Sequence, residues 1–117
     1  MGDRRTAQIV TSHGSLYVYS HWGGSGMPAV AEEAIVAAKE RWGDEPYAVR
    51  IIVDQLTKPG RDQETGYGLL LRPDCEDEYN SDEPSVIIDL LQRTLVVYAR
   101  GDIERAAAFE RVVAEGG

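Results

Sequence analysis

The stretch TAQIVTSHGSLYVY (residues 6–19) decides the fold class of this chain. It consists of two runs of β-branched and aromatic residues on either side of His13-Gly14, a pattern typical of a β-hairpin. A two-residue turn at His13-Gly14 would place Val10 opposite Tyr17 across the hairpin. Both faces of the hairpin would then carry apolar side chains, so we expect at least one of them to be covered by other elements.

Two amphipathic helices are expected after the hairpin. Pro28 suits the first turn of a helix, and apolar residues then recur at three- and four-residue steps as far as Trp42. Asp44 is a good N-cap for a second helix, which ends before Pro59-Gly60. The residues expected to face the core are Ala31, Ala34, Ile35, Ala38 and Trp42 in the first helix, and Ala48, Ile51, Ile52 and Leu56 in the second.

The rest of the chain is predicted to contain three strands and a closing helix. Residues 66–72 have the composition of one strand, and residues 85–99 that of a hairpin with its turn at Gln92-Arg93. Asp102 is then expected to cap a helix that turns one apolar face inward. The residues expected on that face are Ile103, Ala106, Phe109 and Val113.

The order of these elements, ββααβββα, predicts one α+β domain over residues 1–117. We expect a single antiparallel sheet of about five strands with the helices packed on one face. The order of the strands within the sheet does not follow from the sequence. Residues 1–5 are expected to form a disordered tail.

Composition excludes several classes of protein. A chain of 117 residues with a formal net charge of −8 is expected to be one small acidic domain. The single cysteine, Cys75, excludes an internal disulfide framework and a multi-cysteine zinc site, and it fits the reducing cytoplasm. Neither a signal peptide nor an apolar run of ~20 residues is present, so no membrane association is expected. The acidity argues against direct nucleic-acid binding, and no cofactor is predicted.

Most of the net charge lies in one segment, Asp74–Glu83. This segment holds six of the 20 acidic residues and no lysine or arginine, which leaves 14 acidic against 12 basic residues elsewhere. Three interpretations of this segment remain open. It can be a negative surface for a basic protein partner or a solvated connection between strands. It can also be a hard-cation site, although its spacing does not match that of the calcium-binding loop. The residues predicted to bind a partner are Glu76, Asp77, Glu78, Asp82 and Glu83, with Tyr79 as an anchor.

A glycine-rich stretch between the predicted hairpin and the first helix is the other candidate site. Backbone N–H groups in such a loop can surround a phosphate, and a histidine beside it can act as a general acid or base. The Walker-type lysine and the dinucleotide-binding spacing are both missing, so a simple strand-to-helix connection with a tryptophan in the core is the competing interpretation. The residues concerned are His21, Trp22, Gly23, Gly24, Ser25 and Gly26.

Two further patterns bear on a site. The segment Glu64-Thr65-Gly66-Tyr67-Gly68 opens a strand, where its glycines allow a bend or the close approach of a ligand. If it packs against the glycine-rich stretch, Glu64 and Tyr67 would join that ligand site.

His13 is predicted to be an exposed turn residue more than ~20 Å from His21, so the two cannot share a metal ion. An aromatic recognition surface is a further hypothesis, with members Tyr17, Tyr19, Tyr67, Tyr79 and Trp22.

Three segments carry a resemblance to a known family. They are LYVYSHWGG (residues 16–24), AVRII (residues 48–52) and ETGYG (residues 64–68). They resemble the "YLYTHWGG", "ARII" and "ETGYG" segments of an uncharacterised family of small proteins from actinobacterial phages, prophages and bacteria. The resemblance extends from about Ser15 to Ala99, and departs from the family in the longer acidic segment and in Val49. It implies a phage or mobile-element context and assigns no catalytic residue.

Two functions are therefore expected. The leading hypothesis is a non-enzymatic acidic interaction protein, associated with a phage or mobile element, that binds and inhibits a host or defence protein. The alternative is a protein that binds or hydrolyses a nucleotide-like small ligand with residues 21–26. No convincing catalytic constellation favours an enzyme, and a homodimer is compatible with the two-sided apolar hairpin.

Overall fold

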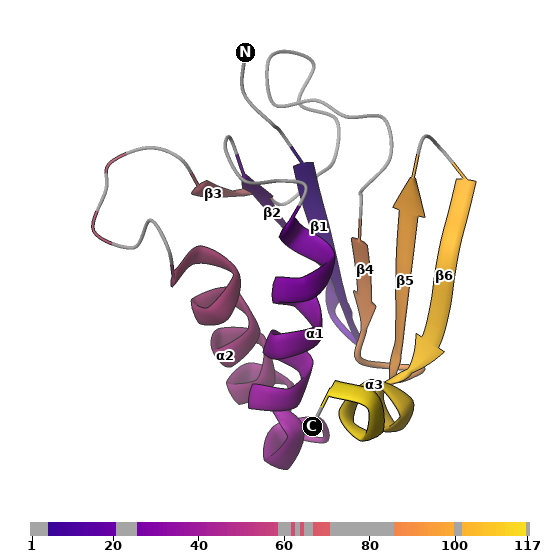
Figure 1. The fold of residues 1–117 in the computed structure, drawn as a ribbon. Coiled ribbons are helices and arrows are strands. Elements are labelled where there is room, and N and C mark those ends of the chain that lie inside the picture. Colours follow the sequence, from indigo (N-terminus) through magenta and orange to yellow (C-terminus); the bar gives the residue numbers. More distant parts are fainter. Residues whose placement is uncertain are drawn as a thin grey trace.

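The computed structural model describes residues 5–20, 26–58, 62, 64, 67–70, 86–99 and 102–116. These residues form six strands and three α-helices, with a short 3-10 helix, η2, after α1 (Figure 1). The strands are β1 (Arg5–Thr11), β2 (Gly14–Ser20), β3 (Tyr67–Leu70), β4 (Val86–Asp89), β5 (Thr94–Ala99) and β6 (Asp102–Ala108). The helices are α1 (Met27–Ala37), η2 (Lys39–Arg41), α2 (Glu45–Thr57) and α3 (Phe109–Gly116).

The strands form one mixed sheet in the order β3-β2-β1-β4-β5-β6. The α+β class is thus confirmed, but the expectation of about five strands in an antiparallel sheet is wrong in two respects. The sheet has six strands, and its central pair, β1 and β4, is parallel. The parallel pair arises because the chain places β2 and β3 on one side of β1 and returns on its other side, with β4 running in the same direction as β1. Of the expected N-terminal tail, Arg5 belongs to β1, and residues 1–4 lie outside the described ranges.

The first hairpin forms with a register different from the expected one. Val10 lies opposite Ser15, not Tyr17, and the turn residues are Ser12 and His13. The Thr11 hydroxyl donates a hydrogen bond to the Gly14 carbonyl at 2.7 Å, and Gly14 has a φ of 126°, which glycine adopts without strain. The register therefore differs by two residues, an even number that leaves every side chain on its expected face.

All three helices lie on the same face of the sheet (Figure 1). Alternate strand residues point toward them, as the pleat requires, and the buried members of this set are Ala7, Ile9, Val18, Val86, Ile88, Leu95 and Val97. The residues predicted to be inward in the first two helical segments are buried, except Ile51, which is partly buried against the core. The core thus lies between one sheet face and the helices, as predicted.

The first helix ends five residues earlier than predicted, at Ala37 rather than Trp42. Ala38 leaves the helical conformation and η2 turns the chain back toward the core. The Trp42 indole N–H then donates to the Ile35 carbonyl at 3.0 Å, and its ring lies 5.0 Å from that of Phe109, centroid to centroid. Trp42 is a core residue, as predicted, and its hydrogen bond satisfies a carbonyl near the helix end.

The largest error of sequence prediction concerns residues 102–108. Asp102 does not cap a helix, because Asp102–Ala108 is the edge strand β6, paired with β5 through a bulge at Val97/Tyr98. Ile103 is 61% exposed and Ala106 is exposed, so they do not share a buried helical face with Phe109. As a strand, this segment forms backbone hydrogen bonds with β5. As a helix, it would gain little from packing, so the pairing with β5 outweighs its helix propensity.

The turn between β4 and β5 is hydrogen-bonded to the first residue of α3. It spans residues 90–93 instead of the two expected, because the Asp89 carboxylate accepts hydrogen bonds from the N–H groups of Leu91 and Gln92 at 2.9 and 3.0 Å. Arg93 then adopts a φ of 55°, and its carbonyl accepts the Phe109 N–H at 2.8 Å. The buried residues of α3 are Phe109 and Val112, with Val113 partly buried.

A pair of alanine variants distinguishes the observed fold from the predicted closing helix. Phe109→Ala is expected to lower the free energy of unfolding by about 3–5 kcal/mol, because it empties a fully buried site. Ile103→Ala is expected to lower it by less than about 1 kcal/mol, because the side chain is exposed on a strand. Urea unfolding monitored by circular dichroism measures both values. Losses of similar size at the two positions would contradict the assignment of β6.

Candidate functional site

The structure describes only part of the two sites predicted from sequence. The partner-binding residues of the acidic segment, Asp74–Glu83, lie outside the described ranges, as do residues 21–25 of the glycine-rich stretch. Gly26 is the N-cap of α1, with open space where a side chain would project. Glu64 is exposed, and Tyr67 is a half-buried residue at the start of β3.

The second glycine of the ETGYG segment has a structural neighbour. A Cβ atom added to Gly68 would lie 2.2 Å from Cε1 of Tyr19, on the adjacent strand. The ring of Tyr19 therefore covers the Gly68 backbone and takes the space that we had considered for a ligand. An alanine at position 68 would therefore require the ring of Tyr19 to move.

The structure describes three of the five residues of the hypothetical aromatic surface and does not place all three on one face. Tyr17 is also only 8% exposed. Tyr17 and Tyr19 alternate along β2 on the face of the sheet opposite the helices, and Tyr98 of β5 lies on the same face. Tyr67 pairs with Ser20 and belongs to the other alternate set. Tyr79 and Trp22 lie outside the described residues.

The face opposite the helices, here called the open face, carries a continuous apolar group. One row of paired residues crosses four strands, from Gln8 through Ile87 and Val96 to Ala106. Tyr98 and Ile103, paired with each other, lie beside this row. Ile87, Val96 and Tyr98 are half-buried, whereas Ile103 and Ala106 are exposed. We call Ile87, Val96, Tyr98, Ile103 and Ala106 the open-face patch.

The charges near the open-face patch are acidic. Asp89 lies one row from it, paired with Val10 and Thr94. Among strand residues whose side chains are described, the open face carries no lysine or arginine. Arg105 belongs to the set that faces the helices, where it forms an ion pair with Glu32 of α1.

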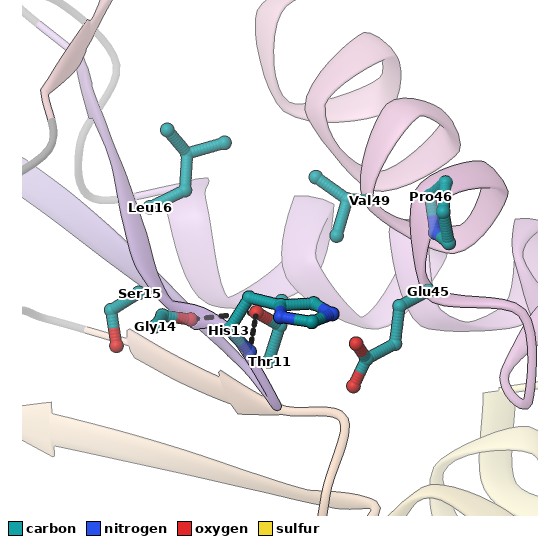
Figure 2. Close-up of a pocket in the computed structure, with 8 residues that line it drawn as sticks. All are labelled: Thr11, His13, Gly14, Ser15, Leu16, Glu45, Pro46 and Val49. Carbon is teal, nitrogen blue, oxygen red and sulfur yellow. Dashed lines mark hydrogen bonds between the residues drawn. The ribbon is translucent and has the colours of Figure 1, made fainter.

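A pocket lies on the other side of the sheet, between the tip of the first hairpin and the start of α2 (Figure 2). We call it the hairpin-tip pocket, and its cavity volume is about 350 Å³. Its polar wall includes His13 and Glu45, and its apolar wall consists of Leu16, Pro46 and Val49. The remaining lining residues are Thr11, Gly14 and Ser15.

Glu45 joins the two elements that form this pocket. Its two carboxylate oxygens accept hydrogen bonds from the hydroxyl of Ser12 at 2.6 Å and from its backbone N–H at 2.9 Å. The hydroxyl bond is the main cause that lowers the pKa of Glu45, the backbone bond is the second, and the charge of His13 adds to them. Glu45 is therefore a carboxylate over the physiological pH range.

Sequence analysis did not identify Glu45. Asp44, the predicted cap, does occupy the N-cap position of α2, but its side chain makes no capping hydrogen bond. The next residue, Glu45, lies 33 positions from Ser12 in the chain, and neither residue belongs to a recognisable motif. An acidic residue in the first turn of a helix is common for electrostatic reasons alone, so nothing in the sequence pointed to this contact.

His13 is an exposed turn residue, as predicted. Within the described ranges, no group of three or more His, Cys, Asp and Glu side chains is arranged to hold a metal ion. The separation of His13 from His21 is untested, because His21 lies outside those ranges.

Gly68→Ala tests the packing of Tyr19 on β3. The added methyl group is expected to lower the free energy of unfolding by about 1–3 kcal/mol, because the ring must move to admit it. In a Tyr19→Ala background the same substitution should cost much less, and the double-mutant cycle isolates the contact. Equal losses in the two backgrounds, measured by urea unfolding, would show that Tyr19 does not require glycine at position 68.

Glu45 is expected to make the stability of the protein depend on pH. Because its pKa in the folded state lies below the ordinary 4.5, its hydrogen bonds stabilise the fold fully above pH 4.5 and are lost as the pH falls through the lowered pKa. Ser12→Ala should raise the pKa of Glu45 toward 4.5, as measured by NMR titration. Ser15→Ala is the control, because Ser15 bonds Gln8 and not Glu45. An unchanged pKa in Ser12→Ala would contradict this account.

Comparisons with known proteins give no information on function, so the functional argument depends on the surfaces and the pocket described above. No helix among the described residues has the length and apolar character to cross a membrane. No family model matches the chain, and searches of curated proteins and of solved structures find no significant match.

Proposed function

We propose that this protein is a non-enzymatic interaction domain that binds a basic protein through the open face of its sheet. The observation that carries the proposal is the open-face patch, where five apolar residues from three strands form a continuous group. Contiguous apolar groups at a protein surface can mark sites of interaction with another protein. Tyr, Val and Ile side chains on a sheet also hold one geometry at low entropic cost, which suits recognition.

Charge supports a basic partner over a second copy of this chain. The described open face carries Asp89 and no lysine or arginine, and the whole chain has a net charge of −8. Two copies would repel each other, whereas a basic protein would be attracted and oriented during encounter. The acidic segment Asp74–Glu83 precedes β4 in the sequence and adds to the same attraction.

The resemblance to a phage-associated family supplies the biological part of the proposal. A phage protein that binds and inhibits a host or defence protein in the cytoplasm would meet many targets that bind nucleic acids through basic surfaces. The alternative of a nucleotide-like ligand at residues 21–26 stays a prediction, because residues 21–25 lie outside the described ranges.

The proposal is tested by site-specific photocrosslinking in cells of the organism that encodes the protein. Benzoylphenylalanine is placed at Ile103, within the open-face patch, or at Leu91, in the β4–β5 turn. These residues are 61% and 57% exposed, so they form a matched pair. We expect a specific protein with a basic surface to crosslink from position 103 and not from position 91.

The partner identified in this way is then purified and titrated. Ile103→Ser is expected to weaken its binding about tenfold, because a small polar side chain replaces an apolar one in the contact without changing the net charge, and Leu91→Ser is expected to leave it unchanged. Added salt should also weaken the binding. Crosslinks between copies of the chain alone, an acidic partner, or equal effects of the two variants would each overturn the proposal.

A further inference from the structure

The hairpin-tip pocket has features of a ligand site that neither the proposed function nor the sequence assigns. Its volume of about 350 Å³ is at the small end of the range for ligand pockets, which suits a group the size of one side chain. Its walls come from two elements far apart in the chain, the β1–β2 hairpin and the first turns of α2 (Figure 2).

The hydrogen bonds of the pocket leave Glu45 as its main free acceptor. The Thr11 hydroxyl is used by Gly14 and His13, donating to the carbonyl of one and accepting from the N–H of the other. A carboxylate oxygen has about two acceptor positions, and Ser12 takes one on each oxygen of Glu45. A further acceptor position therefore remains on each oxygen, and the carboxylate is held in place by Ser12 before any ligand arrives.

The charge of the pocket selects a cation. No lysine or arginine is among the lining residues, so Glu45 is the one charged lining residue at any pH where the His13 imidazole is neutral. An anionic ligand would be repelled by this carboxylate in spite of the nearby helix N-terminus. One carboxylate and one imidazole are also too few ligands for a metal ion.

The apolar wall defines the rest of the ligand. Leu16, Pro46 and Val49 lie on one side of the cavity and the His13 ring and the Glu45 carboxylate on the other (Figure 2). A ligand that fits both sides has a charged end and an aliphatic stem. A guanidinium group suits this arrangement particularly, because its planar donors pair with a carboxylate and its face stacks on a ring.

We propose that the hairpin-tip pocket binds a guanidinium or ammonium group carried on an aliphatic stem, the chemistry of an arginine or lysine side chain. The charged end bonds Glu45 beside the His13 ring, and the stem lies on Leu16 and Val49. This site is separate from the open-face patch and does not rest on the proposed function.

The proposal is tested by NMR titration of the isotopically labelled protein with Nα-acetyl-L-arginine amide. We expect millimolar binding, with the largest shifts at the amides of Gly14, Ser15 and Val49. Nα-acetyl-L-citrulline amide has nearly the same shape without the charge, and it should bind about five- to tenfold more weakly. Free L-arginine is titrated in parallel: tighter binding of the blocked form indicates a residue of a protein, and tighter binding of the free form indicates a small molecule.

Substitutions in the hairpin-tip pocket test whether the arginine derivative binds there. Glu45→Gln should weaken binding of the arginine derivative about five- to tenfold, and Val49→Ala about two- to threefold through lost contact with the stem. Glu110→Gln is the matched control, because it removes the same charge from the first turn of α3 and should have no effect. Equal affinity for the arginine and citrulline derivatives, undiminished affinity in Glu45→Gln, or shifts confined to other regions would overturn the proposal. None of these results depends on the open-face variants.

Discussion

Burial of one side of β1 in the core between the sheet and the helices is the constraint on which the rest of the structure depends. Ala7 and Ile9 of β1 are fully buried, and β1 is the strand that joins the two halves of the sheet, pairing with β2 on one side and β4 on the other. Helix α1 contacts α2, α3 and β4. A helix over the centre of a sheet needs small residues for close approach, and Ala31 and Ala34 are both fully buried.

The placement of the described helices on one face of the sheet leaves the open face as a candidate interaction surface. With the described helices on one face of the sheet (Figure 1), the apolar residues of the other face have no partner among those helices. They include Ile87 of β4 and Val96 of β5. A strand that is apolar on both sides usually has both sides covered. We propose that a second molecule covers the open-face patch, and the acidic charge near it would favour a basic one.

The hairpin tip shows a second consequence of the topology. Because the β1–β2 turn extends to the start of α2, a serine in the turn can hold a glutamate of the helix. The contact orders both elements and aligns a carboxylate beside an apolar wall. The two candidate surfaces lie on opposite sides of the sheet, so one molecule can use them independently.

The sequence alone predicted the elements whose apolar period is strong and local. These elements are the first hairpin, α1 and α2, and nearly all of their predicted core residues are buried. The hairpin register differs by two residues and α1 is shorter than predicted. The elements themselves were predictable because alternation and three- to four-residue spacing follow from strand and helix geometry. Even Trp42, which lies beyond the observed end of α1, was correctly assigned to the core, since its large apolar ring requires burial.

Residues 102–108 mark the limit of this approach. Asp102-Ile103-Glu104-Arg105 followed by three alanines favours a helix locally, and only the free edge of β5 makes it a strand. The parallel pairing of β1 with β4, the approach of Tyr19 to Gly68 and the bond from Ser12 to Glu45 likewise join residues distant in the chain.

The sequence by itself therefore determined the fold class, the location of its acidic charge and the main members of the core. The tertiary structure alone decided which strands are neighbours, which aromatic residues share a face and which carboxylate lines a pocket. The reason is physical: local periodicity specifies which side of an element is buried, whereas contacts between elements depend on how the whole chain packs.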